Sequence, residues 1–234
     1  SRILTIASEL GPDDLCLVLM SGGASALLVE PAEGISLADK QEVNRLLLRS
    51  GANITEINTV RKHLSAVKGG RLAKALSPAR VVTLMISDVP GDDPGVIGSG
   101  PTVPDPTTFA DALEVIQKYS IELPLKVREH LEKGLDETPK QNDCAFVNSE
   151  QRMVARPQES LDAAAMLAKK MGLEVIMLSD QIEGEARDVA RAHASLIRDG
   201  HGPRVYLSGG ELTVTVRGNG QGGPNTEYML AMAI

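Results

Sequence analysis

Tryptophan is absent from the chain, and aromatic residues make up only 2% of its 234 residues. A surface that holds nucleic acid by stacking bases on aromatic rings would have almost no side chains to work with. The net charge is −7 and no basic stripe is visible, which argues further against a polyanionic partner. Apolar residues still make up 42% of the chain, so we expect a real core of Leu, Val, Ile, Ala and Met, and no nucleic-acid partner.

Cysteine is also scarce. Cys16 and Cys144 lie in apolar, strand-like runs, where buried free thiols are expected rather than a disulfide or a nucleophile. This favours a reducing cytoplasm. No apolar run reaches membrane-spanning length and no signal peptide is recognisable, so we expect a cytoplasmic protein without a membrane partner. The chain starts at Ser1 without a methionine and stops inside the apolar run 228–234, so we expect sequence to be missing on both sides.

The order of apolar segments indicates an α/β protein, because short runs typical of buried strands alternate with stretches of helical spacing. Strands are predicted at 15–20, 81–86, 145–148, 174–178 and 205–208, and a strand at 212–216 is predicted to pair back after a Gly209-Gly210 turn. Helices are predicted around Val43, Leu46 and Leu47, and at 59–76, 107–119, 124–131, 157–171 and 183–198. We expect two three-layer α/β domains with mostly parallel sheets. The first, at 1–138, is expected to be Rossmann-like, and a polar linker near 132–142 leads to the second, at 139–234.

Three polar, glycine-rich segments follow predicted strands, and ligands of α/β sheets collect at the carboxyl ends of strands. The first segment, 21–26, contains four residues expected to bind substrate or nucleotide: Ser21, Gly22, Gly23 and Ser25. Small residues let backbone amides approach an anion, and the serines add hydroxyl donors. A tight strand-to-helix turn would explain the glycines equally well. The segment is not a Walker A loop, because no Gly-Lys-Ser/Thr follows.

The second segment, 87–102, places three carboxylates within six positions after a strand: Asp88, Asp92 and Asp93. Magnesium binds through one or two carboxylates together with waters and substrate phosphates, so we expect at least one of the three to touch metal or substrate. Loops are also rich in Asp because of turn formation, and that reading stays open. Further along, Ser99, Gly100 and Thr102 are expected to bind substrate or nucleotide.

The third segment runs from 209 to 225. Pro224 suits the first turn of a helix whose backbone amides would face the loop and form another anion site. The residues expected to bind there are Glu211, Gly222, Gly223 and Asn225. The fragment 218–220 has a faint likeness to a dinucleotide fingerprint, but it lacks the third glycine and a ribose-binding acid downstream.

Basic residues gather around the pair Gly69-Gly70. Arg61 and Lys68 are predicted to share one face of the helix at 59–76 with Ser65. A solvated helix face is the ordinary explanation, but glycines inside a helix cost about 1 kcal/mol each, which suggests close packing or a ligand. We therefore expect Arg61 and Lys68 to be catalytic and the two glycines to contact ligand, with His63 in a structural role. No zinc-ligand spacing and no Gly-x-Ser-x-Gly elbow occurs.

At this point the residues resemble a known family, the glycerate 2-kinases that carry a MOFRL segment. The similar strings are 19–28, 56–65, 68–73, 87–93 and 98–104, and the string from 208 to 225 resembles the start of the MOFRL segment. The resemblance covers essentially the whole chain. Two positions depart from it: the family commonly has glycine at Ala24 and arginine at Pro224, and the second change removes a phosphate contact. The family's N-terminal segment, which supplies a lysine to the site, and the end of the MOFRL segment are not in the sequence.

The resemblance implies an ATP- and Mg²⁺-dependent kinase that makes 2-phosphoglycerate from D-glycerate, with its site in the cleft between two α/β domains. Relatives in tartrate-utilisation operons carry the older name hydroxypyruvate reductase. Arg61 and Lys68 would then clamp phosphate or substrate, and Asp88 is the first candidate for the base that takes the hydroxyl proton. The alternatives are an NAD(P)H-dependent reductase acting on hydroxypyruvate and an incomplete small-molecule-binding fragment. A homodimer is an open prediction.

We further expect the three glycine-rich segments to line one cleft between the two domains, whose closure would exclude water during phosphoryl transfer.

Overall fold

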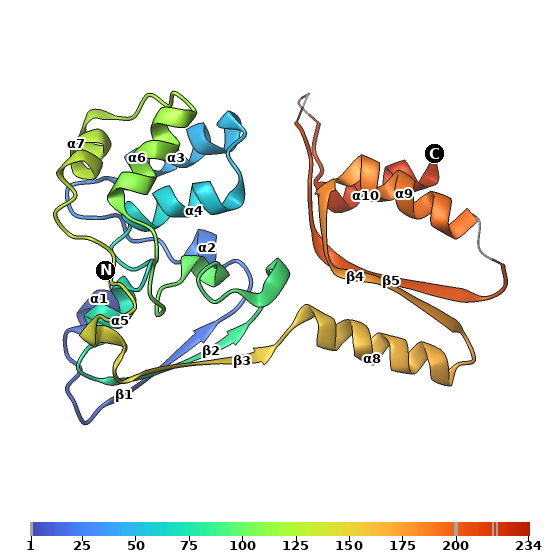
Figure 1. The fold of residues 1–234 in the computed structure, drawn as a ribbon, viewed down its shortest axis with the longest axis horizontal. Helices are drawn as coiled ribbons and strands as arrows, with labels where there is room; N and C mark the ends of the chain where they lie inside the picture. Colours follow the sequence, from blue (N-terminus) through green and yellow to red (C-terminus); the bar gives the residue numbers. More distant parts are fainter. Residues whose placement is uncertain (1, 199–200, 217, 219) are drawn as a thin grey trace. The chain divides into compact units, whose positions relative to one another are not determined.

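The computed structural model describes residues 2–198, 201–216, 218 and 220–234 (Figure 1). The chain forms two compact units, one of residues 1–87 and 93–154, the other of residues 88–92 and 155–234. In chain order the elements are α1 (Arg2–Ala7), β1 (Leu15–Met20), α2 (Ala24–Leu27), α3 (Leu37–Ser50), α4 (Ile54–His63), α5 (Arg71–Leu76), β2 (Arg80–Ile86), η1 (Pro90–Asp92), η2 (Ile97–Ser99), α6 (Phe109–Lys118), α7 (Leu125–Lys133), η3 (Cys144–Phe146), β3 (Ser149–Ala155), α8 (Pro157–Lys170), β4 (Glu174–Glu185), α9 (Ala186–Arg198), β5 (Arg204–Thr213) and α10 (Pro224–Ala233). Along the chain, the boundary between the units falls after Val154, whereas the sequence predicted a domain boundary after residue 138. The division into domains at 1–138 and 139–234 stays a prediction.

The first unit contains a sheet with strand order β1-β2-β3. β1 and β2 are parallel, with Leu15 opposite Arg80 and Met20 opposite Met85, as the predicted strands at 15–20 and 81–86 required. One face of this pair packs against α1 and α5 through a small core that holds Ala7, Leu76 and Val81. This arrangement confirms an α/β fold with parallel strands, and it places the carboxyl ends of β1 and β2 next to each other.

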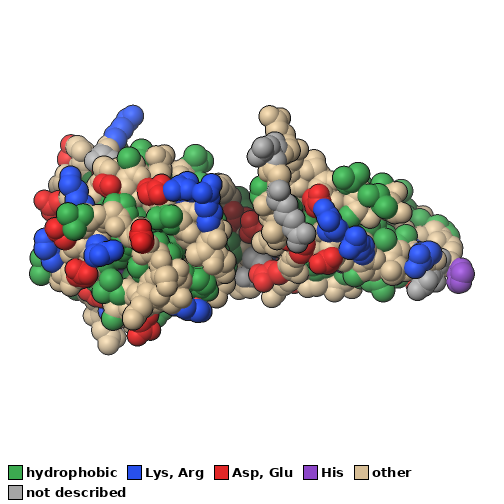
Figure 2. All heavy atoms as spheres, turned by 90° about the horizontal axis from the view of Figure 1, so that it is seen from above, with side chains coloured by type: hydrophobic (Ala, Val, Ile, Leu, Met, Phe, Trp, Pro, Cys, Tyr) green, Lys and Arg blue, Asp and Glu red, His purple; other side chains and the backbone are tan. Residues whose placement is uncertain are grey.

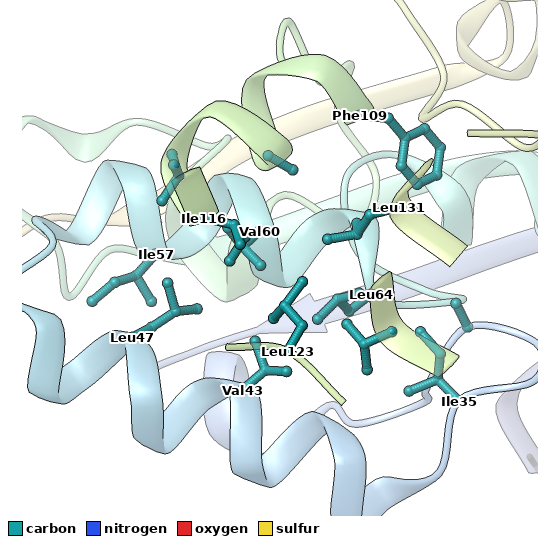
Figure 3. Close-up of a cluster of buried hydrophobic side chains, with 14 residues drawn as sticks. Ile35, Val43, Leu47, Ile57, Val60, Leu64, Phe109, Ile116, Leu123 and Leu131 are labelled. Carbon is teal, nitrogen blue, oxygen red and sulfur yellow. The ribbon is translucent and has the colours of Figure 1, made fainter. Parts of the chain in front are cut away.

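A larger apolar core lies among the helices of the first unit (Figure 3). The side chains that meet there are Val43 and Leu47 from α3, Ile57 and Val60 from α4, Phe109 and Ile116 from α6, and Leu131 from α7. Capping boxes fix where three of these helices begin, since Ser36 pairs with Asp39, Asn53 with Glu56, and Thr108 with Asp111. The helices are therefore held by local capping signals and by burial of one apolar face each.

The predicted single helix at 59–76 is wrong, because α4 ends at His63 and α5 begins at Arg71. Gly69 and Gly70 have φ values of 58° and 81°, the left-handed conformation that breaks a helix and that glycine adopts without strain. A Cβ on Gly70 would lie 2.8 Å from the carbonyl oxygen of Val103, so glycine is also required for close packing.

The basic residues of this stretch do not form a solvated face either. Lys62 is buried with its Nζ 3.2 Å from Asp105 Oδ1. His63 is fully buried, with Nε2 2.9 Å from Glu137 Oε1, and Arg71 pairs with Asp136. Asp136 and Glu137 therefore hold the stretch 132–142, predicted as a linker, against the first unit, which extends to Val154.

Two further expectations about this region need correction. The strand predicted at 145–148 lies later, as β3, and a 3₁₀ turn that contains Cys144 precedes it. Asp143 caps that turn by accepting a hydrogen bond from the backbone N–H of Ala145. Both cysteines carry free thiols, but Cys144 is exposed and Cys16 is half-buried, so the expected burial is wrong for Cys144.

The second unit is built on β4 and β5, which pair in parallel from Glu174 opposite Arg204 to Glu185 opposite Thr213. Figure 1 shows α8 on one side of this pair and α9 and α10 on the other. The predicted turn at Gly209-Gly210 and the returning strand at 212–216 are wrong, because β5 runs through both glycines without interruption. A bulge in β4 shifts the register of the two strands, so that Ser179 lies opposite Ser208 and Ile182 lies opposite Gly210.

On the face shown in Figure 2, Lys and Arg side chains are interspersed with Asp and Glu rather than gathered in a stripe. Within the described residues, no helix combines the length and apolar character needed to cross a bilayer.

Candidate functional site

The first glycine-rich segment and residues 93–102 of the second come together in the first unit, where β1 and β2 are parallel neighbours. Residues 21–26 leave the carboxyl end of β1 and turn into the one-turn helix α2, with Gly23 at φ 81°. Helix α2 lies against η2, which belongs to the segment after β2. The edge of the sheet at which the sequence predicted ligand binding therefore carries both segments.

Lys68 joins these two segments. Its side chain is 1% exposed, and its Nζ donates hydrogen bonds to the carbonyl oxygen of Ser25 at 2.9 Å and to that of Gly98 at 3.1 Å. An ammonium group has three donors, so Lys68 keeps one for a ligand. The structure thus brings Lys68 and Ser25, both predicted site residues, to one place.

The segment after β2 contains three consecutive residues in the left-handed conformation, Gly98, Ser99 and Gly100, with φ values of 61°, 64° and 62°. Ser99 is fully buried, and for a residue with a side chain this conformation costs roughly 1–2 kcal/mol. The turn is held by the predicted glycine pair, since the N–H of Gly69 donates to Ser99 O at 3.0 Å and that of Gly70 to Gly100 O at 2.7 Å. Strain that neighbours hold in place is a common property of ligand sites.

A pocket of about 260 Å³ opens beside Lys68, between α3 and α4. Three cationic side chains line it: Lys40, Arg61 and Lys68. The Arg61 guanidinium donates to Asn44 Oδ1, with Nε at 2.7 Å, while the Nζ of Lys40 is buried without a hydrogen-bond partner among the described residues. No aspartate or glutamate is among the described residues that line the pocket. A group of like charges with no carboxylate among the described lining residues is suited to binding an anion.

The two lysines of the pocket have lowered pKa values. Burial, and then the positive charges of Lys40 and Arg61, lower the pKa of Lys68 to about 7. Burial and the charge of Arg61 lower the pKa of Lys40 to about 8, against an opposing effect of the Glu30 carboxylate. An anion in the pocket would relieve this repulsion and favour the charged forms.

The free energy of unfolding is expected to rise with pH from about 7 to about 10 because of Lys68. An unfolded lysine titrates near 10.4, so over this range the unfolded chain binds more protons than the folded chain, and stability increases with pH. Lys68→Met removes this contribution. From about pH 7 to about pH 9, the free energy of unfolding of the variant, measured by urea denaturation, should rise by about 1–3 kcal/mol less than that of the wild type. Equal gains would show that Lys68 titrates normally in the folded protein.

The three aspartates of the second segment have separate surroundings. Asp88 is exposed, two residues after the end of β2. Asp92 lies 3.4 Å from Arg156 Nε within the second unit, and Asp93 accepts a hydrogen bond from the N–H of Gly95 at 2.8 Å. In the described part of the chain, no group of three or more His, Cys, Asp or Glu residues is placed to hold a metal ion. Binding of magnesium by these aspartates therefore stays a prediction.

Two of the other predicted residues are interior. Thr102 is 1% exposed and accepts a hydrogen bond from the Thr83 hydroxyl at 2.9 Å, so its side chain supports the loop from within. The Ser99 hydroxyl points to Asn58 at 3.4 Å. Contacts of these two side chains with substrate or nucleotide stay predictions.

The third segment borders a pocket of about 1000 Å³ in the second unit. Gly222 and Gly223 line it beside the start of α10, where Pro224 occupies the first turn as predicted. Arg187 and Arg191 of α9 line it too, and Arg187 is paired with Glu227 at 2.6 Å. Glu211, exposed in β5, and Asn225, exposed in α10, are not among the described lining residues, and Asn219 of the 218–220 fragment lies outside the described residues.

Sequence reasoning missed Lys40 and Asn44. Both lie on α3 in phase with the buried Val43 and Leu47, so a charged residue on an otherwise apolar helix face was the available signal. The signal is weak, because long charged side chains often extend along an apolar surface to reach solvent.

Residues 1–132 match the family described as "Domain of unknown function (DUF4147)", and residues 204–234 match the MOFRL family. The chain belongs to the DUF4147/MOFRL glycerate kinase family. The resemblance found in the sequence is thereby confirmed, and the family's members include proteins with two different names.

The D-glycerate 2-kinase of Thermotoga maritima is 42% identical over 240 residues, which cover 100% of this chain and 56% of that protein. A protein of Agrobacterium vitis named "Putative hydroxypyruvate reductase" is 50% identical, over 100% of this chain and 54% of its own length. The crystal structure of the Thermotoga maritima glycerate kinase has a TM-score of 0.79 at 43% identity, and the match covers 99% of this chain and 56% of that one. The chain spans about half the length of these relatives.

Proposed function

We propose that the protein which carries this chain phosphorylates D-glycerate to 2-phosphoglycerate with ATP and Mg²⁺. The observation that supports this most is the pocket lined by Lys40, Arg61 and Lys68 at the carboxyl edge of β1 and β2. Catalysis of phosphoryl transfer depends mainly on positioning the reactants and neutralising their charge, and a small acid held by fixed cations meets both needs.

The two pockets differ in size in a way that suits the two reactants. The cationic pocket, at about 260 Å³, is smaller than sites for drug-sized ligands and suits a three-carbon acid. The glycine-lined pocket of the second unit, at about 1000 Å³, has room for a nucleotide and offers backbone amides at the start of α10. In this proposal ATP supplies the transferred phosphoryl group, and the protein holds and orients the acid. That one cleft holds all three glycine-rich segments stays a prediction.

The finer expectations from the sequence belong to the same proposal. They are the three-layer architecture with a Rossmann-like first domain, the cytoplasmic location and the homodimer. A truncation series of the protein, analysed by light scattering, tests the homodimer. The prediction of a homodimer is contradicted if the protein at its natural length is monomeric at micromolar concentration.

A reductase acting on hydroxypyruvate is the second candidate, because the Agrobacterium vitis relative carries that name. The protein at its natural length should release ADP from ATP when D-glycerate is added, and it should not oxidise NADH or NADPH with hydroxypyruvate. The reverse result would favour the reductase. This chain alone, assayed in parallel, tests whether its two units suffice for activity.

Asp88 is the carboxylate expected to serve the reaction, so Asp88→Asn should lower kcat by about 10²–10⁴-fold. Asp143→Asn is the matched control, because an asparagine Oδ1 still accepts the hydrogen bond from the N–H of Ala145. Its kcat should stay within a few-fold of the wild type. Measuring kcat at several Mg²⁺ concentrations separates loss of metal from loss of a base, since excess Mg²⁺ rescues only the former. Unchanged kcat in Asp88→Asn would remove Asp88 from the proposed mechanism, and unchanged kcat in Asp92→Asn and Asp93→Asn as well would leave the second segment a structural loop.

A further inference from the structure

Lys40 differs from the other two cations of the pocket in its hydrogen bonding. Lys68 has two carbonyl acceptors and Arg61 has the Asn44 side chain, but the Nζ of Lys40 is removed from solvent without a hydrogen-bond partner among the described residues. A buried charge without a partner destabilises a folded protein. A ligand that completes the site would offset this cost.

The lining limits which ligand can complete the site. Apolar side chains of α3 and α4, among them Val43, Leu47 and Val60, form the apolar wall. The three cations form the polar part together with Ser25, Gln41 and Asn44. Such a lining suits a short carbon chain that carries one anionic head group. The volume of about 260 Å³ does not suit a whole nucleotide.

A carboxylate fits the polar part better than a phosphate does. Arg61 and Lys68 already spend hydrogen-bond donors on protein acceptors, which leaves a few directed donors in addition to those of Lys40. A carboxylate presents two oxygens with a single charge, whereas a phosphate presents three or more oxygens with up to two charges to be desolvated.

We propose that the pocket between α3 and α4 binds the carboxylate of a three-carbon acid, and that Lys40 is the residue which recognises it. This inference deepens the proposed function, on which it rests for the identity of the acid. The Lys40 ammonium donates to the carboxylate, Arg61 and Lys68 add charge, and the apolar wall covers the carbon chain. Lys40 thereby determines specificity for acids over the corresponding uncharged alcohols.

The test compares Lys40→Met with the wild type in the protein at its natural length. Methionine keeps the length of the side chain and removes a buried ammonium that has no hydrogen-bond partner among the described residues, so the ligand-free variant should melt at the same or a higher temperature. Calorimetry should show that it binds D-glycerate about 10- to 100-fold more weakly and ATP unchanged. A lysine that only supported the fold would give a lower melting temperature. Lys126→Met, at an exposed lysine of α7, is the matched control and should change neither quantity.

Each outcome separates the inference from the proposed function. Lys40-dependent binding of D-glycerate or hydroxypyruvate without phosphoryl transfer would retain the pocket and overturn the kinase. Phosphoryl transfer with an unchanged glycerate affinity in Lys40→Met would retain the kinase and overturn the pocket. A selective loss of affinity for ATP or inorganic phosphate would show that the pocket holds a phosphate, and no binding of either acid by the wild type would overturn the inference outright.

Discussion

Gly210→Ala is expected to destabilise the second unit by more than about 4 kcal/mol, enough to unfold it. A Cβ at this position would lie 2.1 Å from the carbonyl oxygen and 2.4 Å from the nitrogen of Ile182, where the bulge brings β4 against β5. Both contacts are to backbone, so no side-chain rotation relieves them. The φ of 133° adds further strain for any residue other than glycine.

Gly209→Ala is the matched control for this prediction. The residue is adjacent in the same strand, but its Cβ would meet nothing closer than 3.5 Å, an ordinary van der Waals distance. Its unfolding free energy should change by no more than about 1 kcal/mol. Because the chain has no tryptophan, circular dichroism in urea is the suitable probe. Equal stability of the two variants would contradict the close approach of β4 and β5.

Lys68→Met is expected to lower kcat/KM for glycerate phosphorylation by about 10³-fold or more in the protein at its natural length. The change removes a cation from the pocket and leaves the carbonyls of Ser25 and Gly98 without their donor. The two segments that Lys68 joins would then shift, and a misplacement of about 1 Å can cost 10²-fold in rate.

Two further variants show what Lys68 contributes. Lys68→Gln keeps an amide donor for one carbonyl but has no charge, so stability that recovers while activity does not would assign the activity to the charge. Lys74→Met removes an exposed lysine of α5 whose one ion pair among the described residues is with the exposed Asp136, and the activity of this variant should stay within about two-fold. Near-normal turnover in folded Lys68→Met would remove Lys68 from the proposed mechanism.

The strands at 15–20 and 81–86 and the helix at 157–171 could be predicted because their apolar residues follow the local spacing typical of a strand or a helix. The sequence misled where a residue's role depends on distant neighbours. Gly209-Gly210 has the composition of a hairpin turn, yet a bulge in the neighbouring strand needs the second glycine for space. Gly69-Gly70 was noticed for its cost inside a helix, and the structure shows that the pair directly precedes α5, with Gly70 at its N-cap, and bonds to the 98–100 turn.

In the candidate site, too, local signals predicted some residues and failed where a residue's role depends on distant neighbours. Ser25 and Lys68 were found from a glycine-rich loop and a basic cluster, which are local signals. That Lys68 bonds to both segments depends on the parallel pairing of β1 and β2, which no local pattern specifies. Lys40 was missed because the burial of one nitrogen atom follows from how α3 packs on α4.

The left-handed turn at 98–100 is fastened to Gly69 and Gly70 by main-chain hydrogen bonds. Every amino acid except proline has the same main-chain N–H and C=O groups, and these bonds involve no side chain, so substitutions in the walls of the pocket leave them in place. Val29 and Leu37 line the pocket and are exposed, so they can change size without disturbing these bonds. A lineage or a designer could therefore adapt the pocket to longer or more branched acids one wall residue at a time, while the glycines stay fixed.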